Sequence, residues 1–276
     1  MTSGTQAAQR AASGPWPERL ARMGLAARGV LYLVLGVLAV QIAFGDRGEE
    51  ASQSGALNEV ADQPFGSVLI WLIVVGLFGY ALWRLVTALL GARSDPSATE
   101  GKDRVKALAE GIGYGSVAVV ALRIALSDGS SGGSSGGGGG AEENTATVLS
   151  WPGGQLLVGA AGLLVIGVGI YFIWEGWRTK FTDELKLHEV GPTARKVVVQ
   201  LGRTGRIARG IAFVLIGGFL VAAAVTYDAD KAKGLDGALK SLVDEPYGVV
   251  LLVLVGLGLV AYGCYGLAES KLRRVG

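Results

Sequence analysis

The sequence predicts an all-α, polytopic membrane protein with six transmembrane helices, arranged as three parallel two-helix repeats. Two observations support this prediction. Half of the 276 residues are apolar and only 17% are charged, and six apolar stretches approach or exceed the roughly 20 residues that cross a hydrocarbon core of about 30 Å. In addition, a phrase at 55–66, GALNEVADQPFG, returns at 237–248 as GALKSLVDEPYG, each time directly before an apolar stretch, which indicates an internal repeat.

The charges that flank the predicted spans indicate how the chain is oriented. The spans lie near residues 23–44, 67–90, 107–126, 155–174, 207–226 and 249–268. Most of the 25 basic residues lie on the side that holds both termini and the second and fourth loops. Because basic loops stay on the cytoplasmic side, we expect both termini to be cytoplasmic. The first span could be a secretory signal, but it is long for one and is echoed inside the chain at 205–225, so we interpret it as a mature span.

The chain divides into a tail and three repeats. We expect a disordered cytoplasmic tail at residues 1–22, followed by repeats at 23–92, 107–178 and 203–270. The second repeat has diverged most, and its outer loop contains GSSGGSSGGGGG at 129–140. Such a composition behaves as a flexible coil, so we interpret this loop as a spacer.

The second helix of each repeat carries a glycine four residues before an aromatic residue. This spacing places both on one helix face, where a neighbouring backbone can approach the glycine while the aromatic side chain lies against it. The predicted helix-packing residues are Gly76, Tyr80, Trp83, Gly167, Tyr171, Trp174, Gly258, Tyr262 and Tyr265. The first helices align through Arg28, Glu110 and Arg209, each followed by glycine. Three parallel repeats predict a ring of helices with pseudo-threefold symmetry, with an eccentric bundle as the alternative.

The repeated phrase predicts a short amphipathic helix that lies on the membrane surface, because its apolar residues fall at helical spacing. Pro64 and Pro246 would then each start the next span, where a missing N–H group costs nothing, and an aspartate just before the proline suits a helix cap. We interpret the phrase as a device that returns the chain to the membrane, with an outer binding loop as the alternative. The predicted motif residues are Asp62, Pro64, Gly66, Asp244, Pro246 and Gly248.

The longest link between spans, 175–206, contains a charged stretch, FTDELKLHE, which predicts a short surface helix. The basic residues that follow it are Arg195, Lys196, Arg203 and Arg206. Such a set would attract anionic lipid headgroups by roughly 1 kcal/mol per charge. His188, the only histidine, lies in this link, and we expect it to be solvated.

Six ionisable residues lie near the cytoplasmic ends of the predicted spans, where each charge costs free energy and therefore needs a reason. They are Arg28, Arg84, Glu110, Glu175, Arg209 and Glu269. We expect ion pairs that dock the repeats, with Glu110 and Glu175 pairing with arginines of neighbouring repeats and Arg28 with Glu110 as one such pair. A charged constriction on a path for an ion or small anion is one alternative, and capture of a lipid headgroup is another.

Four segments of the chain carry a family resemblance. ARMGLAARGVLYLVLGVLAV, GRTGRIARGIAFVLIGGFL and the two copies of the repeated phrase resemble the bacterial membrane family catalogued as a domain of unknown function, number 1206. The resemblance covers the chain from about Leu20 to Arg274. It implies three repeated two-helix units in a bacterial plasma (inner) membrane, and it implies no activity and no catalytic or ligand-binding residues.

The sequence favours a non-catalytic role. It offers no histidine for a catalytic triad, no cluster of residues at metal-binding spacing and no glycine-rich phosphate loop, and Cys264 is the only cysteine. We therefore expect no enzyme activity, no cofactor, no metal and no nucleic-acid partner. The expected partners are the lipid bilayer and either anionic lipid headgroups or another membrane protein. The alternative function is a small channel or transporter with a path along the pseudo-threefold axis past the Arg and Glu residues.

Overall fold

The computed structural model describes residues 15–44, 53–62, 66–90, 101–126, 145–151, 153–228, 231, 237–240 and 246–273. Its helices are α2 (Pro15–Ala43), α3 (Gln53–Asp62), α4 (Gly66–Leu90), α5 (Gly101–Leu126), α7 (Gly154–Arg178), α8 (Pro192–Thr226) and α10 (Gly248–Leu272), with the short 3-10 helices η2 (Lys180–Glu184) and η3 (Leu187–Glu189) between α7 and α8. Six helices are long and apolar enough to cross a membrane: α2, α4, α5, α7, α8 and α10. The protein is therefore an all-helical membrane protein with six spans, as predicted.

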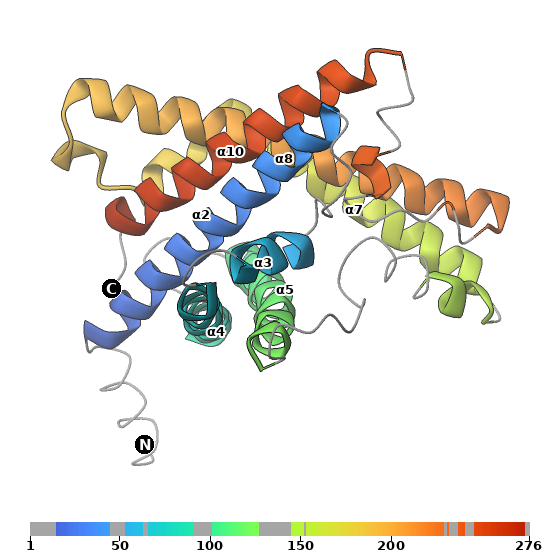
Figure 1. The fold of residues 1–276 in the computed structure, drawn as a ribbon, viewed down its shortest axis with the longest axis horizontal. Coiled ribbons are helices and arrows are strands. Elements are labelled where there is room, and N and C mark those ends of the chain that lie inside the picture. The colour runs from blue at the N-terminus through green and yellow to red at the C-terminus, as the bar shows by residue number, and fades with distance from the viewer. Residues whose placement is uncertain are drawn as a thin grey trace.

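The first helix of each repeat begins, and the second helix ends, at one end of the bundle, which we call the charged end. There, Arg22 near the start of α2 donates to the carbonyl oxygen of Lys271 at the end of α10 (2.8 Å). Likewise, Arg104 near the start of α5 donates to the carbonyl oxygen of Ala88 near the end of α4 (2.8 Å). Figure 1 shows α2 and α10 running side by side over most of their length.

The most closely packed helix pairs join different repeats. They are α4 with α5, α7 with α8, and α10 with α2, so the second helix of each repeat packs on the first helix of the next, and the third repeat closes onto the first. Within repeats, α2 packs on α4 and α8 on α10. The two helices of the second repeat, α5 and α7, do not pack on each other in this way. In Figure 1, α5 lies beside α4 and α7 crosses α8. The second repeat therefore departs from the other two, and the predicted pseudo-threefold arrangement is not confirmed.

Two of these helix–helix contacts, α2 with α10 and α7 with α8, are formed by facing glycines. Gly29 and Gly36 of α2 lie against Gly263 and Gly256 of α10, and Gly210 and Gly217 of α8 lie against Gly169 and Gly162 of α7. Within each helix the two glycines are seven residues apart, about two helical turns, and thus share a face. An added Cβ atom at any of the eight positions would come within 3.0 Å of the partner helix's backbone. Glycine is what permits the helix backbones to approach this closely.

The packing inside the first and third repeats also uses the predicted glycines. Gly76 of α4 lies against Ala27 of α2, and Gly258 of α10 lies against Ala208 of α8. The aromatic residues Tyr80, Trp83, Tyr262 and Tyr265 are all buried. An added Cβ atom at Gly24 or at Gly205 would collide with Tyr80 or Tyr262, so small residues at these two positions let the tyrosines pack.

The corresponding residues of the second repeat are not packed as we predicted. Tyr171 and Trp174 are 44% and 42% exposed, and an added Cβ atom at Gly167 would meet nothing within 4 Å. The alignment of the first helices explains the difference, because Lys106 stands where the other repeats have Gly24 and Gly205. A lysine side chain occupies the space that the tyrosine of α7 would need. The ammonium group of Lys106 lies instead 5.7 Å from the centre of the Tyr171 ring.

The short amphipathic helix is docked in the bundle and does not lie free on a surface. In α3, Ala56 and Leu57 are fully buried, and the helix packs against α2, α4 and α5. An added Cβ atom at Gly66, the first residue of α4, would collide with the carbonyl oxygen of Ala61, so this glycine permits the start of α4 to lie close to the end of α3.

Pro246 does not start the next span, in contrast to the prediction. Pro246 lies in a turn before α10, which begins only at Gly248. Tyr247, between them, has a φ of 65°. Asp62 is the last residue of α3, whereas Pro64 and Asp244 lie outside the described residues.

Two further segments differ from the prediction. Residues 15–22, expected in the disordered tail, form the start of α2; residues 1–14 and the spacer 129–140 lie outside the described residues. The stretch 181–189 forms 3-10 turns instead of a surface helix, because Phe181, Leu185 and Leu187 are buried. The backbone N–H of Lys186 also donates to the carbonyl oxygen of Leu272 (2.7 Å). This link therefore covers the charged end beside α10.

The facing glycines predict a contrast between two adjacent residues of α8. Gly217→Ala should lower the free energy of unfolding by about 1–3 kcal/mol, because the added methyl group overpacks the contact with α7. Gly218→Ala should leave it unchanged or slightly raised, since a methyl group there meets nothing within 4 Å and alanine favours the helix. Unfolding in detergent micelles would measure both, and equal losses would contradict the packing described.

Candidate functional site

Ionisable side chains from all six spans gather near the charged end; most are buried, and Lys106, Glu110 and Glu184 are half-buried. We call this set the charged cluster; it consists of Arg28, Arg84, Lys106, Glu110, Glu175, Glu184, Arg206, Arg209, Glu269 and Arg273. Arg28 lies seven residues after the start of its span at Ala21, a depth of about 10 Å along the helix. At this depth a charge needs partners within the protein.

One ion pair joins α2 to α10. Arg28 Nη2 lies 2.6 Å from Glu269 Oε2, and both side chains are buried. Glu269 Oε1 accepts from Arg273 Nη1 (2.6 Å), one helical turn further along. Arg273 in turn lies 2.8 Å from a carboxylate oxygen of Glu184 in η2. The first repeat, the third repeat and the covering link are therefore tied together by charge.

A second ion pair joins α4 to α5. Arg84 Nε lies 2.7 Å from Glu110 Oε2, and the Tyr80 hydroxyl donates to the same oxygen (2.8 Å). The Tyr80 oxygen also accepts from Arg28 Nη1 (3.0 Å) and from Arg84 Nε (3.1 Å). Tyr80 thus connects the second ion pair to the first.

A third group joins the second and third repeats. Glu175 of α7 accepts from Lys106 Nζ of α5 (3.0 Å) and from Arg206 Nη1 of α8 (3.2 Å). Arg206 also donates through Nη2 to the hydroxyl of Tyr265 on α10 (3.1 Å). The Lys106–Glu175 contact ties the two helices of the second repeat, α5 and α7, to each other at the charged end.

Arg209 differs from the other cations of the cluster because it has no carboxylate within ion-pair distance in the described part of the chain. Its Nη1 donates to the hydroxyl of Tyr262 (2.8 Å). Its guanidinium carbon lies over four aromatic rings, at 4.4 Å from the centre of Phe172, 5.3 Å from Tyr262, 5.4 Å from Tyr32 and 5.4 Å from Phe213. Its Nε is buried without a hydrogen-bond partner.

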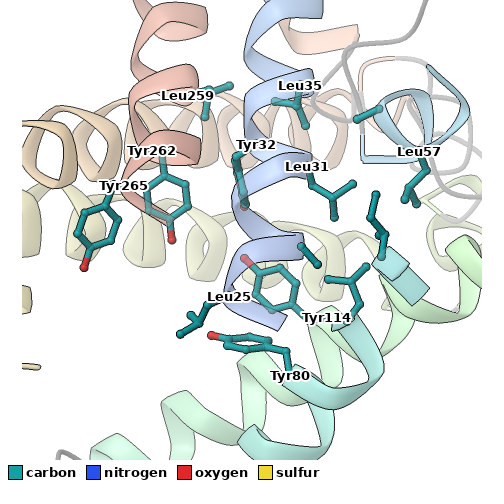
Figure 2. Close-up of a cluster of buried hydrophobic side chains, with 14 of the residues drawn as sticks. Leu25, Leu31, Tyr32, Leu35, Leu57, Tyr80, Tyr114, Leu259, Tyr262 and Tyr265 are labelled. Atoms are coloured by element: carbon teal, nitrogen blue, oxygen red, sulfur yellow. The ribbon is translucent and has the colours of Figure 1, made fainter. Parts of the chain in front are cut away.

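The tyrosines around the two central arginines come from four helices. Tyr32 packs edge-on against Tyr262 (4.8 Å between ring centres), and Tyr80 packs edge-on against Tyr114 (5.0 Å). Figure 2 shows the hydroxyl ends of Tyr32, Tyr114 and Tyr262 directed toward one another. The hydroxyl of Tyr114 is buried and has no hydrogen-bond partner.

The structure places the six predicted charges as follows. Arg28 meets Glu269, Arg84 meets Glu110, Glu175 meets Arg206, and Arg209 meets aromatic rings. The two glutamates of the second repeat do face arginines of neighbouring repeats. The expected direct pair of Arg28 with Glu110 does not form, because Tyr80 lies between them and bonds to both.

Sequence reasoning missed four members of the cluster: Lys106, Glu184, Arg206 and Arg273. Arg206 was assigned to a surface set, but it lies three residues before Arg209 and so shares its helix face. Arg273 lies four residues after Glu269, which is the spacing of an ion pair within one helix. Lys106 could have been found from the alignment of the first helices, where it replaces a glycine.

Comparisons with known proteins agree with this architecture. A family model described as Domain of Unknown Function (DUF1206) matches three segments of the chain, residues 23–91, 105–179 and 204–273. The chain is also similar to the uncharacterized protein YxxB of Bacillus subtilis (strain 168), with 35% identity over 257 residues, which cover 93% of this chain and 91% of the relative. No solved structure matches the chain.

The third ion-pair group predicts selective coupling. In a double-mutant cycle, Arg206→Met and Glu175→Gln should show an interaction free energy of about 1–3 kcal/mol in unfolding measurements, because the two side chains are in direct contact. The matched cycle of Arg209→Met with Glu175→Gln should give less than about 0.5 kcal/mol, since Arg209 has no contact with that carboxylate. Similar coupling in both cycles would mean that the pairing described is wrong.

Proposed function

We propose that this chain, which belongs to the DUF1206 family, is a non-catalytic structural or interaction component of the bacterial plasma membrane whose second repeat binds anionic lipid. The observation that carries the proposal is the difference between the repeats. The first and third repeats close their two helices against each other through small residues, whereas the second repeat leaves a face between α5 and α7 without such packing.

This face, which we call the open flank, is apolar and lies within two spans. Added Cβ atoms at Gly113 of α5 and Gly167 of α7 would meet nothing within 4 Å. Leu163, Leu164 and Ile170 of α7 are exposed apolar side chains on the helix face that carries Gly167 and Tyr171. Lipid chains are the partner that such a surface meets in a membrane.

Charge at the rim of the open flank favours an anionic lipid. Trp174 of α7 is 42% exposed, and two cations lie over its indole ring: Lys180 Nζ at 4.8 Å and the guanidinium of Arg178 at 5.6 Å. Aromatic residues collect at the headgroup level of a bilayer, and basic residues there attract anionic headgroups. The abundance of exposed basic residues at the charged end also supports a cytoplasmic placement of that end.

The remaining charges support a scaffold role. Each buried carboxylate of the charged cluster contacts at least one cation, and most of these contacts join different helices. Beyond the cluster, the buried side chains where α2 meets α10 are apolar, for example Leu35, Leu38, Leu252 and Leu259. A water-filled path would need polar groups there. These features favour interaction over the alternative of a channel or transporter, and they offer no catalytic arrangement.

The proposal predicts that the protein transports neither ions nor small solutes. Purified protein in liposomes should give the same ion conductance and solute efflux as protein-free vesicles, because apolar side chains fill the centre of the bundle. Glu110→Gln should not change this result. Folded protein must be confirmed in the same vesicles by its thermal unfolding. Flux that depends on Glu110 would instead make the charged cluster part of a pathway and would overturn the proposal.

The proposal also predicts lipid selection at one face. A photo-crosslinking side chain in place of Tyr171, on the open flank, should capture anionic phospholipid in excess over its share of the membrane. The same side chain in place of Phe78, which is 40% exposed on α4, should capture lipids in proportion to their abundance. Mass spectrometry of the adducts would compare the two. Equal lipid composition at both positions, or a protein adduct alone at Tyr171, would contradict lipid binding there.

A further inference from the structure

We propose that Arg209 and Tyr114 form a binding site for a single phosphate group behind the open flank. This inference deepens the proposed function and rests on it, since it names the chemical group that the second repeat would recognise. The phosphate could belong to a phospholipid headgroup or be free inorganic phosphate.

The charge of Arg209 is not balanced within the described chain. The other five cations of the charged cluster each contact a carboxylate. Arg209 is as buried as they are, with 9% of its surface exposed, and it contacts only a hydroxyl and aromatic rings. A buried charge without a counter-charge costs several kcal/mol. An anion beside Arg209 would remove much of this cost.

Two hydrogen-bond donors near this position are unused. Arg209 Nε and the Tyr114 hydroxyl are both buried without partners, although such groups are almost always bonded in native structures. The Nε groups of Arg28, Arg206 and Arg273 share this state, whereas no other hydroxyl in the described part of the chain does.

Tyr262 and Arg28 lie between the two donors: the guanidinium of Arg209 is 5.3 Å from the Tyr262 ring, and that of Arg28 is 5.6 Å from the Tyr262 ring and 6.0 Å from the Tyr114 ring. In Figure 2 the hydroxyl end of Tyr114 is directed toward the region that holds the hydroxyl ends of Tyr32 and Tyr262.

These donors suit an oxyanion with one negative charge. A guanidinium presents several N–H groups in a plane, which matches the oxygens of a phosphate, and a phenol hydroxyl adds a donor from another direction. A phosphodiester carries a single negative charge, which would give the guanidinium of Arg209 the anionic partner that it lacks in the described chain. Phosphate is therefore the ligand chemistry that fits both the charge and the number of donors.

Both helices of the second repeat contribute residues to the surroundings of Arg209 and Tyr114. Tyr114 belongs to α5, and Phe172 of α7 is the aromatic residue closest to Arg209, at 4.4 Å. Phe172 follows Tyr171, which is exposed on the open flank. A lipid bound to the open flank would have its headgroup near the charged end, where the ion pair between Lys106 and Glu175 joins α5 to α7.

Thermal unfolding in a neutral detergent would test the site in the full-length protein. We expect phosphatidylglycerol or inorganic phosphate, added at fixed ionic strength, to raise the unfolding midpoint, and phosphatidylcholine to leave it unchanged. Arg209→Gln and Tyr114→Phe should each weaken the apparent affinity roughly tenfold or more, as expected for the loss of one charge-assisted hydrogen bond. Arg123→Gln is the matched control, because Arg123 lies exposed in the last turn of α5, the helix that carries Tyr114, at the end remote from the charged cluster, and it should keep the response.

The outcomes separate the sources of phosphate. A response to phosphatidylglycerol but not to inorganic phosphate identifies a lipid ligand, and the reverse identifies a free anion; either supports the site. No response to both compounds, or an equal response in Tyr114→Phe and the native protein, overturns it. Tyr114→Phe decides the matter if Arg209→Gln does not fold, since it keeps the aromatic ring. Lipid selection at Tyr171 that persists in both variants would retain the proposed function and remove this inference.

Discussion

The pairing of buried charges between helices is the constraint on which the rest of the structure depends. A carboxylate within a span has no water to solvate it, so it must find its cations in the protein. Glu269 receives one from α2 and one from its own helix, and Glu175 receives cations from α5 and α8. Such short contacts require closely spaced backbones, which the facing glycines of α2 and α10 and of α7 and α8 allow. Electrostatics and close packing therefore specify the same helix neighbours.

One change of residue type stands at the contact between the two helices of the second repeat. Where Gly24 and Gly205 let a tyrosine of the partner helix pack, Lys106 extends a cation toward Glu175. The contact between the two helices of this repeat thus changes from packing along their length to an ion pair at one end. In this repeat Tyr171 is exposed and a Cβ atom at Gly167 would meet nothing within 4 Å. The second repeat therefore has an exposed face, the open flank, that the first and third repeats lack.

The sequence was sufficient for the six spans and the three repeats, because run length and repeated phrases are properties of the chain itself. The partners of the charges were harder to predict, since they depend on which repeats become neighbours. Arg28 was expected near Glu110 but meets Glu269, which is 241 positions away in the chain. Arg206 was assigned to the surface because the basic stretch before it suggested a link, whereas α8 already begins at Pro192. The isolation of Arg209 was not visible, because equal numbers of predicted bases and acids suggested complete pairing.

The closure of the third repeat onto the first has a consequence for biosynthesis. The partner of α2 is α10, and roughly 200 residues separate the end of one from the start of the other. At ~5–20 residues per second, Arg28 enters the membrane on the order of ten seconds or more before Glu269 has been translated. During that interval the glycine face of α2 and Arg28 lack their partner helix. They therefore need other contacts, either with the insertion machinery or with lipid headgroups. The last helix to be made is therefore the one that completes the first.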